Sequence, residues 1–144
     1  MQTPFYASGF LYSPKTHQIF LIQREQVWSI LGGESNKGEE AQAAFVRIVS
    51  ELLNLDLKAK NIYPIYDYFH DDLAKMNYVF YAEVKKPQEF ESLKVGTYGW
   101  VSFKETPKLP FTSHSKQDVI VGERVINAKW RENEAKNAEV GGQI

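Results

Sequence analysis

Apolar positions along the chain follow two periods, which predicts a mixture of strands and helices. Runs rich in β-branched and aromatic residues, bounded by turn residues, predict strands at 5–12, 18–24, 61–69, 77–85 and 98–103. Pro14-Lys15-Thr16 predicts a hairpin turn between the first two strands, and the glycines of segment 29–38 predict a loop. Because strands and helices do not alternate regularly, the pattern favours a layered α/β or α+β domain.

The strongest helix prediction covers residues 40–53. Its apolar positions fall at i, i+3, i+4, i+7 and i+8 and form one stripe, made of Phe45, Ile48, Val49, Leu52 and Leu53. Asn54 follows the stripe, and asparagine tolerates the left-handed conformation in which many helices end.

The C-terminal part of the chain is expected to form a second helix, from about 115 to 132, after a loop marked by Pro107 and Pro110. The candidate packing residues of this helix are Val119, Ile120, Ile126 and Trp130. No repeat or Pro/Gly/Ser-rich linker divides the chain. Residues 1–136 are therefore predicted to form a single domain and 137–144 a flexible tail.

The composition excludes several classes of protein. The chain has 144 residues, enough for one compact domain, and 43% of them are apolar. It carries 17 Lys and Arg against 18 Asp and Glu, a net charge of -1, which disfavours binding to long nucleic acids. It has no Cys, which excludes disulfides and thiolate nucleophiles. Since neither a signal-peptide pattern nor a membrane-spanning apolar run is visible, we expect a cytoplasmic protein without membrane contact.

A spaced motif joins the predicted loop to the first predicted helix. Gly33 is followed after five residues by Glu39, and after seven more by Arg47. This spacing resembles the box of the Nudix (MutT-like) hydrolases, G-x5-E-x7-R-E-U-x-E-E-x-G-U, where U is a bulky aliphatic residue. Six of the nine fixed positions match, namely Gly33, Glu39, Arg47, Val49, Glu51 and Leu55. The three positions that differ hold Ile48, Leu52 and Asn54.

The resemblance implies a fold as well as a motif. Segment 28–33 is similar to the usual approach to the box, and the hairpin before it and the strand after it fit the family's order of elements. The resemblance therefore implies the Nudix α/β/α sandwich, in which a mixed, curved sheet lies between the box helix and a C-terminal helix.

In the family, three glutamates of the box helix hold divalent cations, usually Mg²⁺, that bind a diphosphate. Their spacing of i, i+3 and i+4 puts them on one helix face, and Mg²⁺ prefers such oxygen ligands. The corresponding residues here are Ile48, Glu51 and Leu52, so Glu51 is the one metal ligand that the resemblance implies. Glu39 and Arg47 are implied to form a supporting ion pair. We therefore expect Mg²⁺, or Mn²⁺ in its place, to be weakly bound or absent.

Other groups in or near predicted loops stay open as additional metal ligands, and these are Glu34, Glu40, Asp71, Asp72, Glu89 and Glu91. The run His70-Asp71-Asp72 is similar to a metal cluster only superficially, because neighbouring side chains of an extended segment point in alternating directions. A turn is the preferred interpretation of this run. His17 and His114 are placed in loops without an identifiable acid–base partner.

The candidate substrate-binding residues are Trp28, Gly32 and Gly33 near the start of the box and Tyr68 on a later strand. Aromatic side chains at Trp28, Tyr66, Tyr68 and Phe69 are able to stack on a base, but strand aromatics more often pack in a core.

Two functional hypotheses follow. The first is a Mg²⁺-dependent pyrophosphohydrolase of weakened activity that cleaves a nucleoside diphosphate linked to another moiety, with Glu51, Arg47 and Glu39 as site residues. The second is a non-catalytic Nudix-fold module for a ligand or a protein, because Ile48 and Leu52 would leave an apolar patch for a partner. The expected partner is a nucleotide-like small molecule, and a homodimer or a protein partner stays open.

Overall fold

The computed structural model describes residues 3–90 and 96–142, with side chains as far as residue 136. Its strands are β1 (Tyr6–Ser13), β2 (Gln18–Arg24), β3 (Val27–Ser29), β4 (Leu31–Glu34), β5 (Ile62–His70), β6 (Lys75–Glu83) and β7 (Thr97–Ser102). Its helices are α1 (Ala41–Leu53) and α2 (Ser113–Gly142), with short 3₁₀ turns at Ala59–Asn61 and Thr106–Lys108. All five predicted strands and the first predicted helix are confirmed, with small shifts at their boundaries.

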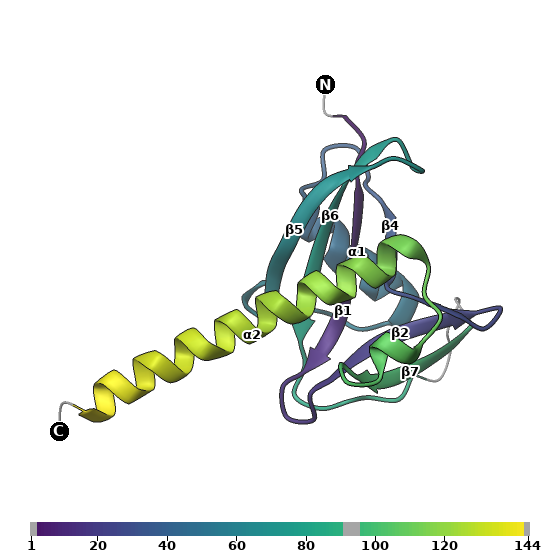
Figure 1. Ribbon diagram of the computed structural model, residues 1–144. Coiled ribbons are helices and arrows are strands. Elements are labelled where there is room, and N and C mark those ends of the chain that lie inside the picture. Colours follow the sequence, from purple (N-terminus) through teal and green to yellow (C-terminus); the bar gives the residue numbers. More distant parts are fainter. Residues whose placement is uncertain (1–2, 91–95, 143–144) are drawn as a thin grey trace.

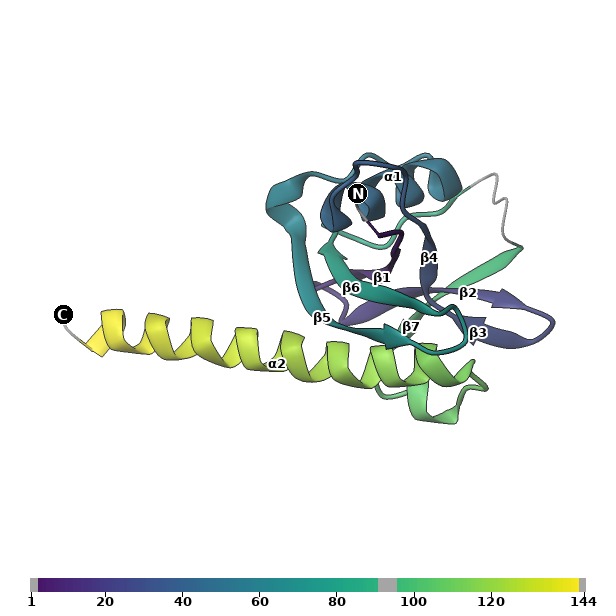
Figure 2. The same ribbon diagram turned by 90° about the horizontal axis from the view of Figure 1, so that it is seen from above.

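The strands form one mixed sheet in the order β3-β2-β1-β6-β5, with β4 paired to β1 and β7 paired to β2. Strand β1 runs parallel to β6, from Tyr6 opposite Asn77 to Tyr12 opposite Glu83, and antiparallel to β2 and β4. Helix α1 lies on one face of the sheet and α2 on the other (Figures 1 and 2). The predicted α/β/α sandwich is therefore confirmed.

Alternating side chains of the sheet build two cores, one under each helix. Under α1, the buried sheet residues include Ala7, Leu11, Phe20, Ile22 and Phe80. Under α2, they include Phe10, Ile19, Leu21, Val79 and Tyr81. Because neighbouring strand residues point to opposite faces, a sheet that is covered on both sides has nearly continuous apolar strands. This explains why all four residues of the run 19–22 are buried.

Helix α1 ends where the sequence predicts. Asn54 adopts φ 55° and ψ 38°, the left-handed conformation, and its N–H donates to the carbonyl of Ser50 at 2.9 Å. Phe45, Ile48, Val49 and Leu53 of the predicted stripe are buried. Leu52 is half-buried at the edge of the same core.

The predicted loop at 29–38 is wrong in part, because residues 31–34 form β4. Gly32 pairs with Ser8 and Gly33 with Ala7 of β1. The two glycines are required by close packing: a Cβ on Gly32 would lie 2.6 Å from the ring of Tyr6, and one on Gly33 would lie 3.1 Å from Ile48. The two glycines predict a loop from the sequence, but in the structure they belong to a strand that packs closely against the side chains of Tyr6 and Ile48.

Helix α2 is longer than predicted and uses fewer of the predicted packing residues. Val119 and Ile126 are buried, but Ile120 is 43% exposed and Trp130 is 57% exposed. Ile120 is one residue beyond Val119 and so is rotated by about 100° away from the core. The C-terminal part of α2 extends past the sheet as an arm (Figures 1 and 2). The flexibility of 137–144 stays a prediction, and residues 143–144 lie outside the described residues.

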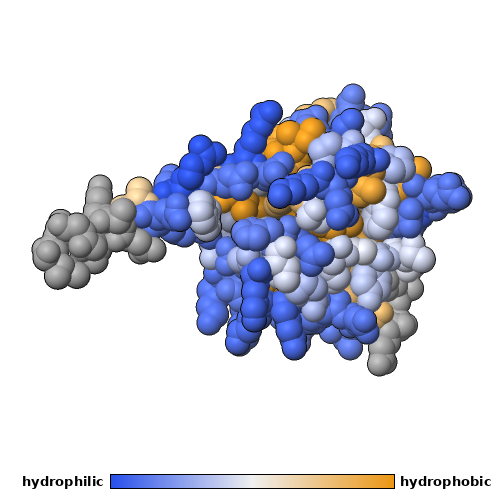
Figure 3. Space-filling view, turned by 60° about the horizontal axis from the view of Figure 1, so that its bottom comes forward, coloured by the Kyte–Doolittle hydropathy of each residue, from blue (hydrophilic) through white to orange (hydrophobic). Residues whose placement is uncertain are grey.

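The described surface carries no large apolar face in the view of Figure 3, where hydrophilic side chains surround small apolar patches. Within the described ranges, neither helix is both long and apolar enough to cross a membrane.

Gly9 lies where β1 is flanked by β4 and β6, and a side chain there has no space. A Cβ would lie 2.1 Å from the carbonyl oxygen of Phe80 and 2.8 Å from the ring of Phe45. We expect Gly9→Ala to lower the free energy of unfolding by about 3 kcal/mol, measured by urea denaturation. Asp67→Ala on the exposed side of β5 is the control, with a change below about 0.5 kcal/mol. Equal stability of the two variants would contradict the packing argument.

Candidate functional site

Arg47 on α1 is the centre of the polar contacts between the helix and the loop before it. Its Nε and Nη2 donate to the two carboxylate oxygens of Glu39, at 2.8 and 3.0 Å. Nη2 also donates to the carbonyl oxygen of Glu34 at 2.7 Å, and the backbone N–H of Asn36 donates to Glu39 at 2.8 Å. A bidentate, charge-assisted pair of this kind fixes orientation as well as distance. The loop is therefore folded back onto α1.

Each partner of this pair favours the charged form of the other. Hydrogen bonding from Arg47 lowers the pKa of Glu39 below its usual value, and hydrogen bonding from Glu39 raises the pKa of Arg47. The side chains of Arg47 and Glu39 are 24% and 15% exposed, so water screens their attraction only in part.

The next turn of α1 presents three residues that differ in their surroundings. Ile48 is buried in the core next to Gly33. Glu51 is 60% exposed, and both of its carboxylate oxygens accept from Nη1 of Arg47 at 3.2 Å. Leu52 is half-buried and forms part of the wall of a neighbouring cleft.

The cleft has a volume of about 590 Å³ and lies between the start of β1, β4, the end of α1, the β5–β6 turn and the start of α2. This volume is within the range of about 300–1,000 Å³ that is common for small-molecule sites. Its polar lining residues include Arg24, Gly32, His70, Asp72, Asn77, His114 and Asp118. The cleft therefore combines one guanidinium, two carboxylates and two imidazoles with an apolar wall at Leu52.

A buried hydrogen-bonded network supports one side of the cleft. Asp118 is 2% exposed and accepts hydrogen bonds from the hydroxyls of Tyr66, at 2.7 Å, and Tyr68, at 3.3 Å. Asn77 donates to the hydroxyl of Tyr68 at 3.1 Å and accepts from Ser8 at 2.8 Å. Burial raises the pKa of Asp118, and the hydrogen bonds of the two tyrosines oppose that rise. The pKa values of both tyrosines are raised, mainly by burial and also by Asp118.

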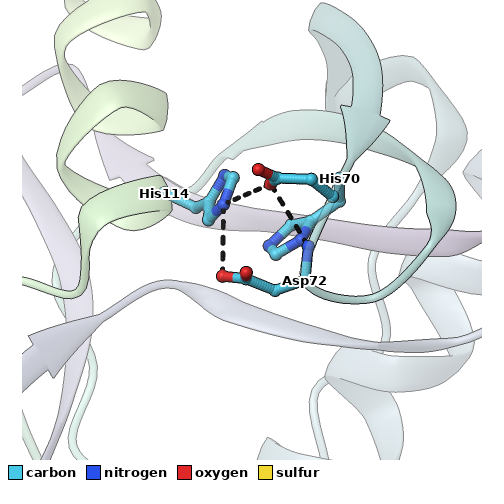
Figure 4. A group of neighbouring side chains, drawn as sticks. His70, Asp72 and His114 are labelled. Atoms are coloured by element: carbon cyan, nitrogen blue, oxygen red, sulfur yellow. Dashed lines mark hydrogen bonds and ion pairs between the residues drawn. The ribbon is translucent and has the colours of Figure 1, made fainter.

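A second polar group lies at the mouth of the cleft, where the β5–β6 turn meets the start of α2. Nε2 of His114 lies 3.3 Å from Oδ1 of Asp71 and 3.6 Å from Oδ2 of Asp72. Figure 4 shows His114 on α2 facing His70, at the end of β5, and Asp72 on the turn that follows. The predicted turn is confirmed at Asp71 and Asp72, whereas His70 is the last residue of β5. The prediction that His114 has no acid partner is wrong. A turn reverses the chain, so the alternation argument for extended residues does not apply there.

The comparison with protein families settles the lineage. The model of the NUDIX domain matches residues 3–121, which is most of the chain. The chain belongs to the Nudix family. No sequence among the curated proteins matches it.

Solved structures share the Nudix fold at low sequence identity. The C. elegans Ap4A hydrolase, in a binary complex, is 14% identical with a TM-score of 0.67, over 85% of this chain and 98% of that chain. The Nudix domain of Shewanella oneidensis NrtR, complexed with ADP ribose, is 13% identical with a TM-score of 0.65, over 88% and 90%. The C-terminal domain of mouse MUTYH, in a complex with human PCNA, is 13% identical with a TM-score of 0.63, over 88% and 91%. At these identities, the likeness shows the fold alone.

The Nudix helix of this chain does not fit the three-glutamate Mg²⁺ site that the family resemblance implies. The alkyl side chains of Ile48 and Leu52 offer no ligand atoms, and Ile48 is 3% exposed. Glu51 is held by Arg47. A single exposed carboxylate leaves Mg²⁺ to be held mainly by water and by the phosphates of a ligand.

The other candidate acids do not complete this face. Glu34 forms an ion pair with Lys75, while Glu40 and Glu89 are exposed. Glu91 lies outside the described residues. Within the described part of the chain, three or more possible ligand residues meet at one place, the group of His70, Asp71, Asp72 and His114.

The predicted substrate-binding residues have different positions. Gly32 lines the cleft, and Gly33 lies behind it against Ile48. The ring of Trp28 packs over Gly99, where a Cβ would lie 3.0 Å from it. Tyr68 lies in the network under the cleft and stacks on His114, with 5.8 Å between ring centroids. Arg24, Asn77 and Asp118 were not predicted, since nothing in their local sequence distinguishes them from ordinary surface or core residues.

Glu39→Gln removes the negative charge from the pair with Arg47. We expect the free energy of unfolding at pH 7 to fall by about 1–2 kcal/mol, measured by urea denaturation. Because the pKa of Glu39 is lowered in the folded state, this contribution is present above the unfolded-state pKa and is lost as the pH falls through the folded-state pKa. The difference between wild type and Glu39→Gln should therefore shrink in acid.

The matched control is Glu40→Gln, since Glu40 is the exposed neighbour and makes no side-chain cap to α1. It should leave stability unchanged within about 0.5 kcal/mol. A Glu39→Gln difference that stays constant from neutral pH into acid would contradict the role of the Glu39 charge.

Proposed function

We propose that this Nudix domain binds a nucleotide-like ligand, a nucleoside diphosphate linked to another moiety, in the cleft beside α1. We further propose that hydrolysis by its box is weak. The observation that carries the first statement is the cleft itself, with Arg24 and the backbone of β4 on its walls. The observation that carries the second is the pair of alkyl side chains at Ile48 and Leu52.

The lining chemistry supports a ligand with both phosphate and nucleoside parts. A guanidinium such as Arg24 matches phosphate oxygens in geometry and in charge. Asp118 and Asn77 offer oxygens and an amide on another part of the wall, and these suit hydroxyl and amino groups. Two neighbours in fold support the same class of ligand. The NrtR domain is in a complex with ADP ribose, and the C. elegans protein is named as an Ap4A hydrolase.

Weak hydrolysis follows from the ligand count. Even the loss of one outer partner of a metal ligand costs about 10–100-fold in metal affinity or activity. Two direct ligand positions are replaced here, so we expect Mg²⁺-dependent turnover at least about a hundredfold below that of a box with three glutamates. Glu51 is the residue on which remaining turnover would depend.

The second candidate function is binding to a protein partner or to a second copy of the chain. The exposed C-terminal part of α2 favours it. This helix extends past the sheet, and Trp130 on it is 57% exposed. The fold neighbour from mouse MUTYH is in a complex with a protein. Light scattering of the wild type and of Trp130→Ser tests self-association, and a monomer at all concentrations would remove the homodimer from consideration.

The ligand proposal predicts binding with little turnover. Calorimetric titration with ADP-ribose and Ap4A should show one site for at least one of the two, and Arg24→Gln should weaken that site by about tenfold or more. Arg124→Gln on the exposed side of α2 is the control and should bind as the wild type does. If neither compound binds, or if the two arginine variants behave alike, the assignment of the cleft is wrong.

The hydrolysis proposal predicts a gain of activity. Leu52→Glu puts a second carboxylate beside Glu51 at the cleft wall, so Mg²⁺-dependent release of nucleoside monophosphate should rise about tenfold or more above wild type. Leu52→Gln has the same shape without the charge and should not gain activity. Ile48→Glu would bury a charge and should destabilise the fold by about 3 kcal/mol or more, so the single change at Leu52 is the informative one. Fast turnover by the wild type that is lost in Glu51→Gln would overturn the proposal and support a working hydrolase.

A further inference from the structure

Four possible metal ligands meet where the β5–β6 turn lies against the start of α2. His70 is the last residue of β5, Asp71 and Asp72 follow on the turn, and His114 is on α2. One ligand atom of each lies within 4.8 Å of all the others. We propose that this group binds one divalent transition-metal ion of the Zn²⁺ type at the mouth of the cleft. The site is separate from the box helix, and its test uses the metal alone, so it does not depend on nucleotide binding.

Two distances within the group match those between ligands of one ion. In a tetrahedral site with metal–ligand bonds of about 2.0–2.2 Å, neighbouring ligand atoms lie about 3.3–3.6 Å apart. Nε2 of His114 lies 3.3 Å from Asp71 and 3.6 Å from Asp72. A charge-assisted hydrogen bond between the same atoms would be shorter, at about 2.7–2.9 Å. The carboxylates therefore surround the nitrogen at the spacing of shared coordination.

The two imidazoles are placed to act together. The ring centroids of His70 and His114 are 3.6 Å apart, with an interplanar angle of 26°. The backbone N–H of Leu73 donates to Nδ1 of His70 at 3.3 Å, so a metal bound at that nitrogen would replace this contact. Nδ1 of His114 is buried and has no hydrogen-bond partner among the described residues, so Nε2 is the nitrogen directed at the carboxylates (Figure 4).

The charge around the group also favours a cation. Asp71 and Asp72 are about 80% exposed at the mouth, and Asp118 lies 2% exposed beneath the ring of His114. Tyr68 connects these layers, because its ring is stacked 5° from parallel with His114 and its hydroxyl donates to Asp118. The three carboxylates, Asp71, Asp72 and Asp118, place negative charge around the group, and a divalent ion would offset much of it.

The mixture of nitrogen and oxygen ligands favours a transition-metal ion over Mg²⁺. Mg²⁺ requires near-octahedral oxygen ligands, whereas imidazole with carboxylate suits Zn²⁺ and related transition metals. His70, Asp72 and His114 also line the cleft, so the ion would lie next to a ligand bound there.

The test is a calorimetric titration of the untagged, metal-free full chain with zinc chloride. The chain has no Cys and 3 His, so few other strong ligands compete. We expect one ion per chain, no displacement by excess Mg²⁺, and a rise in Tm of roughly 5 °C or more when zinc is about a hundredfold above Kd. Absence of a 1:1 site would mean that the group is only an ion pair between His114 and the two aspartates.

Variants locate the site. His114→Gln and Asp72→Asn should each weaken zinc binding at least about tenfold. The controls are His17→Asn on the β1–β2 turn and Asp67→Asn on β5, both exposed and outside the group, and they should bind as the wild type does. Zinc affinity that survives His114→Gln and Asp72→Asn, or that falls equally in the controls, would overturn the proposal. The Tm of each metal-free variant shows that folding is retained, and Asp72 is exposed enough to be replaced without loss of packing.

Nuclear magnetic resonance gives an independent readout on the unaltered chain. With 3 His in the sequence, the imidazole nitrogen signals can be assigned individually. Zinc should shift the ring signals of His70 and His114 and leave those of His17 unchanged. Shifts confined to His17, or absent from all three rings, would contradict the site.

Discussion

The contact between Arg47 and Glu39 is the constraint on which the rest of the site depends. It joins the loop after β4 to the middle of α1, and the same guanidinium holds the carbonyl of Glu34. Strand β4 is thereby held between β1 and α1, where Gly32 and Gly33 let Tyr6 and Ile48 approach the backbone. Because charge-assisted bidentate pairs fix direction, this one contact sets both the path of the loop and the wall of the cleft. The pair forms although Ile48 and Leu52 beside it carry no carboxylate, which indicates that its main contribution is to the scaffold.

The alkyl residues Ile48 and Leu52 affect the energetics of α1 more than its geometry. A carboxylate at position 48 would lie against Gly33 in a buried environment and would need a metal or a partner to offset its desolvation. Isoleucine needs neither and adds apolar area to the core under α1. The helix therefore gains stability without any ion. The capacity of α1 to hold a metal ion is lower, because Glu51 is bound to Arg47 and offers one ligand where the family resemblance implies three.

The sequence predicted the parts of the molecule that are determined by periodicity. The stripe from Phe45 to Leu53 and the strand runs such as 18–24 depend on spacing within one segment, and the box motif adds the fold. Features made by contacts between distant segments were missed. Strand β4 was predicted as a loop because glycine close packing depends on Tyr6 and Ile48, and the partner of His114 is on a turn far away in the sequence. The exposure of Trp130 could not be predicted either, since it depends on where the sheet beneath α2 ends.

The walls of the cleft differ in charge, and this difference determines which ligands the cleft can bind. The α1 wall ends in Leu52, whereas the opposite wall carries Asp72, Asp118 and two histidines. Arg24 contributes a cation to the same space. Opposite charges that water screens only in part attract over a few ångströms, so a ligand with an anionic end and a hydrogen-bonding end would be oriented as it enters. In the family, as the resemblance describes it, negative charge on the box helix would attract a metal to the α1 wall. Here the described carboxylates that line the cleft are on the β5–β6 turn and α2, and any cation that accompanies a ligand is attracted to that side.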